Sequence, residues 1–138
     1  MPVDRNELIR IARTWIGVPF LHRGRSREGI DCGGLLIAVG REIGLKIDEP
    51  NTYSMSPDPG VIETSLKRYC TQIEIDSAQA GDILWLSFAG EPRHVGFATD
   101  TGLLHAWAGP GKVVEHTVDS VWKKRVRAAY RLHEVESA

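Results

Sequence analysis

Two cysteines and five histidines are the side chains of this 138-residue chain best suited to nucleophilic and acid–base chemistry. Cys32 stands in the stretch EGIDCGGLLIAVGREIGL, where it opens an apolar run that predicts a helix from about Cys32 to about Ile43. Unpaired backbone N–H groups at the start of a helix favour a thiolate, so this position predicts a lowered pKa for the Cys32 thiol. The second cysteine, Cys70, falls late in another helical pattern, residues 61–70, and we expect it to belong to the core.

A thiol nucleophile requires a base within hydrogen-bond reach, and the base requires a group that orients it. His94 opens the segment HVGFAT, and His105 lies late in the segment GLLHAW that follows it. If these segments are adjacent antiparallel strands joined by a turn at residues 100–102, the two imidazoles lie on one face as diagonal or offset neighbours. The sequence therefore offers His94 and His105 as a candidate imidazole pair.

The same residues also have purely structural interpretations. A single cysteine at a helix start is most often a small buried hydrophobic residue. The regular spacing of His94, His105 and His116 is compatible with a metal site, but the chain has no HExxH or paired-cysteine pattern, so we expect no bound metal. Without a metal, His116 is expected to be an outward-facing strand residue. Trp107, close after His105, is expected either to pack in the core or to line a cleft.

Charge and composition narrow the possible partners. The chain carries 17 Lys and Arg against 18 Asp and Glu, so no basic surplus indicates a nucleic-acid partner. Hydrophobic residues make up 42%, which is typical of a globular protein, and the length suits one domain spanning residues 1–138. The N-terminal sequence MPVDRNELIRIARTW has no continuous apolar core, so we expect neither a signal peptide nor membrane insertion.

The predicted elements are helices first and strands second. A helical pattern over residues 4–16 has Asp4 as its N-cap, and residues 18–29 are expected to form a loop. A turn-rich connector, residues 48–60, leads to the last helical pattern. The remaining segments are short and rich in aliphatic and aromatic residues, at 81–88, 93–99, 102–108, 112–118 and 125–132. This order predicts an α+β domain with N-terminal helices packed on a C-terminal antiparallel sheet of about five strands.

Five short motifs follow one another along the chain: GVPF at 17–20, DCGG at 31–34, AGDI at 80–83, HVGF at 94–97 and HA at 105–106. In order and spacing they resemble the motifs of the NlpC-type cysteine peptidases, papain-like enzymes that cut peptidoglycan stem peptides. The resemblance covers nearly the whole chain and implies a papain-like fold. It also implies that Cys32 is the nucleophile, that His94 is the base and that His105 orients this base.

The resemblance extends to the substrate. It implies a peptidoglycan stem peptide, cut between D-glutamate and the diamino acid, with no metal or organic cofactor. Asp31 matches a family aspartate that in some members helps to hold the free amino end of the stem peptide. Gly33 stands where the family usually has serine, and Phe20 stands where it usually has tyrosine. With Trp107, these residues form the predicted substrate-binding set.

A finer resemblance is to short, single-domain members encoded among bacteriophage tail genes and in gene transfer agents. It rests on the stretches DCGGLLIAVGREIGL, SPDPG and VVEHTVDSVWKKRV. It implies tail or tail-like hub proteins as partners, assembly in the cytoplasm and action in the periplasm. Two other interpretations stay open: a structural tail or hub component with a vestigial peptidase fold, and a papain-like amidase or acyltransferase that acts on another amide.

Overall fold

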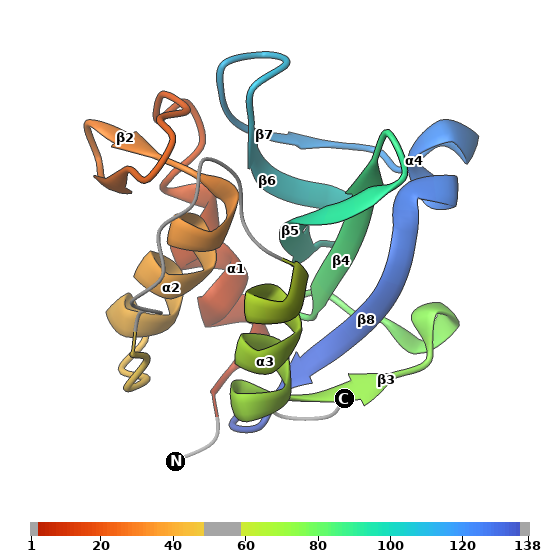
Figure 1. The fold of residues 1–138 in the computed structure, drawn as a ribbon. Helices are drawn as coiled ribbons and strands as arrows, with labels where there is room; N and C mark the ends of the chain where they lie inside the picture. Colours follow the sequence, from red (N-terminus) through yellow and green to blue (C-terminus); the bar gives the residue numbers. More distant parts are fainter. Residues whose placement is uncertain (1–2, 49–58, 136–138) are drawn as a thin grey trace.

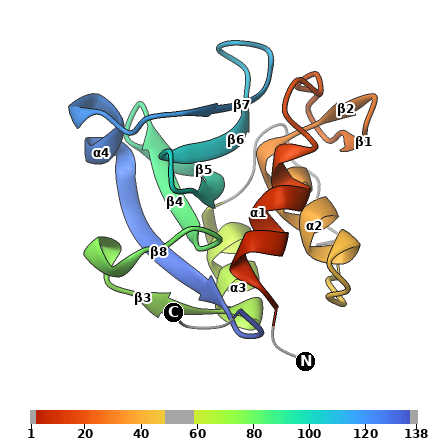
Figure 2. The same ribbon diagram turned by 180° about the vertical axis from the view of Figure 1, so that it is seen from behind.

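The computed structural model describes residues 3–48 and 59–135 of the chain. Three helices lie on one side of a curved sheet, as Figures 1 and 2 show: α1 (Arg5–Arg13), α2 (Cys32–Glu42) and α3 (Pro59–Tyr69). The sheet strands are β3 (Cys70–Ile73), β4 (Ile83–Phe88), β5 (Glu91–Ala98), β6 (Leu103–Trp107), β7 (Lys112–His116) and β8 (Val126–Leu132). A 3₁₀ turn, η1 (Ile75–Ser77), follows β3, and the short helix α4 (Ser120–Arg125) precedes β8. The predicted α+β class is confirmed.

The sheet has the strand order β3–β8–β4–β5–β6–β7, and each neighbouring pair is antiparallel. It contains six strands rather than about five, because the sequence pattern did not predict β3. The helix expected over residues 61–70 ends one residue earlier, and Cys70 begins β3, where it pairs with Leu132 of β8. Cys70 is buried, as expected.

Helix α1 begins as predicted and ends early. The Asp4 side chain accepts a hydrogen bond from the Asn6 N–H at 2.8 Å and so caps the first turn. Helical spacing buries Leu8 and Ala12 against the sheet. The helix ends at Arg13 rather than near residue 16, and Ile16 is 45% exposed instead of packing on the apolar face.

The segment between α1 and α2 is more ordered than the expected loop. It contains the two-stranded hairpin β1 (Arg25–Ser26) and β2 (Gly29–Ile30). This hairpin brings the chain directly to Asp31, the N-cap of α2. Most of the predicted connector, residues 49–58, lies outside the described residues.

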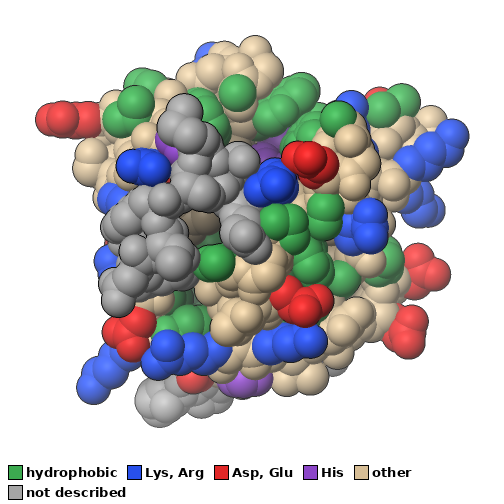
Figure 3. Space-filling view, in the orientation of Figure 1, with side chains coloured by type: hydrophobic (Ala, Val, Ile, Leu, Met, Phe, Trp, Pro, Cys, Tyr) green, Lys and Arg blue, Asp and Glu red, His purple; other side chains and the backbone are tan. Residues whose placement is uncertain are grey.

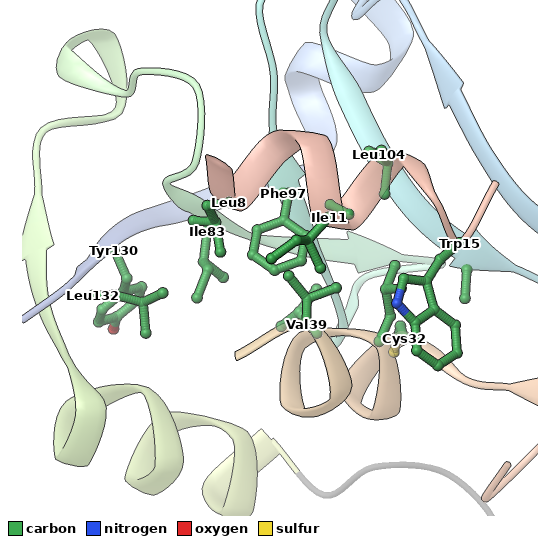
Figure 4. Close-up of a cluster of buried hydrophobic side chains, with 14 of the residues drawn as sticks. Leu8, Ile11, Trp15, Cys32, Val39, Ile83, Phe97, Leu104, Tyr130 and Leu132 are labelled. Atoms are coloured by element: carbon green, nitrogen blue, oxygen red, sulfur yellow. The ribbon is translucent and has the colours of Figure 1, made fainter. Parts of the chain in front are cut away.

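Both faces of the sheet are packed. On the inner face, side chains of α1 and α2 meet alternate residues of the strands, among them Phe97 and Leu104, and Figure 4 shows Cys32 and Trp15 in this cluster. On the outer face a smaller cluster includes Leu86 and Leu103, with Trp122 of α4 packed against it. Along β4 the two clusters alternate as the period of two requires: Ile83 and Trp85 belong to the inner cluster, and Leu84 and Leu86 to the outer one.

A fully buried carboxylate ties both chain ends to the middle of the sheet. Asp82, just before β4, accepts hydrogen bonds from Arg5 of α1, from Arg131 of β8 and from the Gln79 N–H. A parallel bridge between Val3 and Val135 joins the two ends directly. Among the described residues, no helix is long and apolar enough to cross a membrane.

Candidate active site

The thiol of Cys32 lies at the start of α2, against strand β5. Backbone N–H groups of Val95, Gly33 and Cys32 itself hydrogen-bond toward the sulfur and act to lower its pKa. Burial is the larger influence, since Cys32 is only 6% exposed, and it raises the pKa of the thiol to about 11. The predicted lowering of this pKa is therefore wrong: the helix N-terminus is present, but removal from water outweighs it.

His94 and His105 form the imidazole pair predicted from the strand pattern. The β5–β6 ladder comprises the pairs Phe97↔Leu104 and Ala98↔Leu103. This register sets His94 diagonally across from His105, and their Nε2 and Nδ1 atoms are 2.6 Å apart. Gly96 makes the approach possible, because a Cβ there would lie 2.9 Å from the Cβ of His105.

Both imidazoles are buried and uncharged. Burial, and the nearby Arg125 cation after it, lower the pKa of His94 to about 4. Burial, followed by the neighbouring imidazoles His94 and His116, lowers the pKa of His105 to about 2. At neutral pH the site therefore contains a protonated thiol and neutral imidazoles. In the space-filling view, small areas of histidine surface show in the upper half of the face (Figure 3).

A third histidine continues the pair into a row. His116 of β7 lies with its Nε2 2.8 Å from the Nε2 of His105, and its Nδ1 is 2.8 Å from the Thr117 carbonyl oxygen. Because β7 pairs with β6, His116 and His105 share one face of the sheet, and His116 is half-buried there rather than fully exposed to solvent. The sequence signal was the equal spacing of eleven residues between successive histidines.

Aromatic rings surround this row of histidines. Trp107 stacks on His105 at a centroid distance of 5.8 Å, and Trp122 of α4 meets His105 edge-on and His116 at a tilt. Phe88 contacts His94 edge-on and stacks on Trp107. The rings hold the imidazole planes while adding little charge. Sequence reasoning did not single out Phe88 or Trp122.

The histidine row is not arranged as a metal site. A zinc ion requires ligand nitrogens that converge on one point at about 2.0–2.1 Å. Here the nitrogens of His94, His105 and His116 face one another in hydrogen bonds instead. Within the described residues, no group of three or more His, Cys, Asp or Glu side chains is arranged to hold a metal ion.

The sequence matches the model of the NlpC/P60 family over residues 17–131. The chain belongs to the NlpC/P60 family. The family resemblance carried by the five motifs is thereby confirmed.

Two relatives illustrate this membership, and one solved structure illustrates the shared fold. The murein DD-endopeptidase MepS/murein LD-carboxypeptidase of Escherichia coli K12 is 25% identical over 120 residues, which are 86% of this chain and 57% of that protein. The probable endopeptidase NlpC of the same organism is 26% identical over 124 residues, 87% of this chain and 73% of the relative. The chain thus spans little more than half the length of MepS. The peptidoglycan hydrolase RipB of Mycobacterium tuberculosis superposes with a TM-score of 0.69 at 20% identity, covering 96% of this chain and 65% of that one.

In this NlpC/P60 domain, the Asp31 carboxylate accepts hydrogen bonds from three donors. One carboxylate oxygen accepts from the Gly34 N–H and from the Arg25 guanidinium, both at 2.7 Å, and the other accepts from the Arg23 N–H at 2.9 Å. The carboxylate therefore caps α2 and fixes the hairpin. Its predicted part in holding a substrate amino group remains a prediction. Such an amino group would compete with the Arg25 guanidinium for the Asp31 carboxylate.

The two glycines after Cys32 differ in their surroundings. A Cβ at Gly34 would lie 2.7 Å from the Gly24 carbonyl oxygen, so this glycine permits the hairpin to pack against α2. A Cβ at Gly33 would meet no atom closer than 4.0 Å. Of the two, only Gly33 leaves space at the helix start, which is compatible with its predicted place in the substrate-binding set.

The other two predicted substrate residues lie on different elements. Phe20 is half-buried, packs against the main core and forms a bridge with Ile30 of β2. Trp107 ends β6 and is stacked directly on His105. Trp107 therefore adjoins the histidine row, whereas Phe20 belongs to the segment that leads into the hairpin.

Proposed function

We propose that this protein is a cysteine endopeptidase that hydrolyses an amide bond in the peptide part of peptidoglycan. The observation that carries the proposal is the 2.6 Å hydrogen bond between His94 and His105, on the strand whose Val95 N–H reaches the Cys32 sulfur. Nucleophile, base and orienting group thus come from α2, β5 and β6. The names of the relatives MepS and NlpC, both endopeptidases, support the same reaction class.

In the proposed reaction, the thiol attacks as it loses its proton. Because the Cys32 pKa is raised and the His94 pKa is lowered, a standing thiolate–imidazolium pair is disfavoured. The Nε2 of His94 is engaged by His105, so the Nδ1 atom is the one that takes the thiol proton. The sulfur bonds to the carbonyl carbon, and the resulting oxyanion is met by backbone N–H groups, that of Cys32 among them.

The reaction then completes in three proton transfers. The imidazolium of His94 gives its proton to the leaving amine as the C–N bond breaks, which leaves a thioester on Cys32. Water attacks this thioester and gives a proton to His94, and that proton returns to the sulfur as the C–S bond breaks. The products are a free amine and a carboxylic acid, and the enzyme is restored without any cofactor.

The scissile bond is the finer part of the proposal. The motif resemblance favours the bond between D-glutamate and the diamino acid, whereas the name of the relative MepS designates DD-endopeptidase and LD-carboxypeptidase activities. A sharp test incubates the purified protein with three defined muropeptides: an uncross-linked stem peptide, a DD-cross-linked dimer and an LD-linked tetrapeptide. Mass spectrometry distinguishes the three cleavages, and Cys32→Ala is the matched control. Cleavage of the stem peptide between its second and third residues is expected.

The biological setting is proposed on the finer resemblance to phage tail and gene transfer agent members. The stretches DCGGLLIAVGREIGL and VVEHTVDSVWKKRV support a role in breaching the cell wall during particle entry. The test is the presence of the protein in purified particles together with tail or hub proteins. If the folded protein cleaved none of the three muropeptides, the alternatives would be favoured. These are a structural tail component, and an amidase or acyltransferase that acts on another amide.

A further inference from the structure

The three histidines form one continuous hydrogen-bonded row across β5, β6 and β7. His94 contacts His105 at 2.6 Å, His105 contacts His116 at 2.8 Å, and His116 contacts the Thr117 carbonyl oxygen at 2.8 Å. The family resemblance assigned roles to the first two imidazoles only. The row ends on a backbone atom, and this end decides how protons are distributed along it.

A carbonyl oxygen only accepts hydrogen bonds, so the Nδ1 of His116 must carry the proton of that contact. A neutral imidazole has one N–H, and the Nε2 of His116 is therefore an acceptor. The Nε2 of His105 must then donate to it, which leaves the Nδ1 of His105 as an acceptor. The Nε2 of His94 donates to that atom in turn.

The last member of the row is consequently fixed as well. With its proton on Nε2, His94 has an unprotonated Nδ1, the state that a general base requires. If the Nδ1 of His116 carried no proton, every proton in the row would move to the opposite ring nitrogen. The Nδ1 of His94 would then carry an N–H where the lone pair is needed. His105 has no access to water to relieve such a conflict, because it is fully buried.

Neighbouring groups support a neutral row. Burial lowers the pKa of both His94 and His105, and the charged group facing His94 is Arg125, which disfavours an imidazolium. Trp122 holds His116 at a centroid distance of 4.7 Å and His105 at 5.1 Å, so the rings keep their planes.

We propose that His116 is a positioning residue: anchored on the Thr117 carbonyl, it sets the direction of the N–H groups in the row so that the Nδ1 of His94 is free to accept the Cys32 proton. The catalytic consequence rests on the proposed function, whereas the tautomer itself is a property of the folded chain. An experiment can therefore contradict the proposed tautomer without contradicting the proposed reaction, and the reverse.

The decisive measurement is the tautomer of His94. Protonated and unprotonated imidazole nitrogens differ strongly in ¹⁵N chemical shift, and Cys32→Ala provides a stable background at about pH 8, where unperturbed histidines are neutral. We expect His94 to carry its proton on Nε2 in this background and in C32A with His116→Gln, whose amide both accepts and donates. In C32A with His116→Leu we expect both tautomers. A proton on the Nδ1 of His94 in the C32A background would overturn the proposal without any variant of His116.

Kinetics on a cleaved muropeptide supply the second readout. In the active enzyme, His116→Leu should lower kcat by about 10- to 100-fold with KM changed less than about twofold, because positioning is lost and binding is not. His116→Gln should restore most of kcat. The exposed His133, substituted to Leu and to Gln, is the matched control and should change neither quantity. A loss of kcat with an unchanged His94 tautomer, or full activity of His116→Leu, would refute the positioning role.

Discussion

The two cysteines of this chain have almost the same burial and very different neighbours. Cys32 is 6% and Cys70 5% exposed, and burial raises the pKa of their thiols to about 11 and about 12. Around Cys32, backbone N–H groups oppose that rise, although the charge of Asp31 adds to it. Around Cys70, the charges of Glu134 and Asp82 add to it. A buried thiol is therefore no sign of function by itself; the donors around the sulfur distinguish the two sites.

The two thiols also differ in whether a proton acceptor lies near them. Neither cysteine is a thiolate at neutral pH, so reactivity depends on a nearby acceptor for the proton. Cys32 lies against β5, the strand that carries His94. Cys70 begins β3, an edge strand that is separated from β5 by β8 and β4. We therefore expect the two thiols to differ in reactivity and this difference to depend on the imidazoles near Cys32.

The largest difference is expected from deleting each thiol. Cys32→Ala should lower kcat/KM by on the order of 10³-fold or more, because no other group replaces the nucleophile. Cys70→Ala should retain activity within about threefold, since this thiol only packs in the core. Both variants should lose about 1 kcal/mol or less of unfolding free energy in urea. Muropeptide hydrolysis by Cys32→Ala at the parental rate would exclude Cys32 as the nucleophile.

The next effect concerns the imidazoles. His94→Ala should fall close to the Cys32→Ala level, because the thiol then has no proton acceptor. His105→Ala should cost on the order of 10²-fold through lost orientation, and His105→Asn less, because an amide oxygen can accept from the Nε2 of His94. The measurement is kcat/KM on one soluble stem peptide. Full activity of His105→Ala would mean that His105 is only a packing residue.

Alkylation should separate the thiols without any substrate. In native protein, limiting iodoacetamide should modify Cys32 about 10-fold faster than Cys70, because N–H groups stabilise the developing thiolate at Cys32 while Glu134 and Asp82 oppose it at Cys70. Peptide mapping by mass spectrometry gives the ratio. In guanidinium the two rates should become similar, which serves as the control. Faster labelling of Cys70 in native protein would contradict the assignment.

The smallest effect is expected from the cation beside the histidine row. Burial, and after it the charge of Arg125, lowers the pKa of His94 to about 4. Because His94 must be unprotonated to act as base, activity should fall as the pH drops toward that value. Arg125→Gln should raise this pKa and move the acid limb of kcat/KM upward by as much as about one pH unit. Lys124→Gln removes the same charge from an exposed position of α4 and should leave the limb in place. Equal shifts in both variants would indicate a general charge effect.

Local patterns predicted the parts of the fold that depend on neighbouring residues. Asp4 caps α1 as expected, and the period of two placed His94 and His105 on one face. Strand β3 escaped prediction because residues 70–73 follow α3 with no glycine or proline between them, and its pairing with β8 joins segments far apart in the chain. No local signal specifies such a long-range partner.

At the site, the residues that bear on the chemistry were easier to predict than their electrostatic state. The pKa of Cys32 departed from expectation because a helix N-terminus is visible in the sequence and burial is not. The contacts of His116 depend on the orientation of its ring and on the path of the backbone at Thr117, which spacing alone does not determine. The catalytic and substrate-binding roles of Cys32, His94, His105 and the other candidate residues stay predictions until the variants are measured.

The bridge between Val3 and Val135 has a consequence for where a label can be attached to this domain. Because that bridge is parallel, the chain runs in the same direction through both residues, and its two ends diverge from one pole of the domain. Figures 1 and 2 place this pole at the far end of the molecule from the start of α2. A label attached beside Val3 or Val135 would therefore lie far from the buried thiol of Cys32.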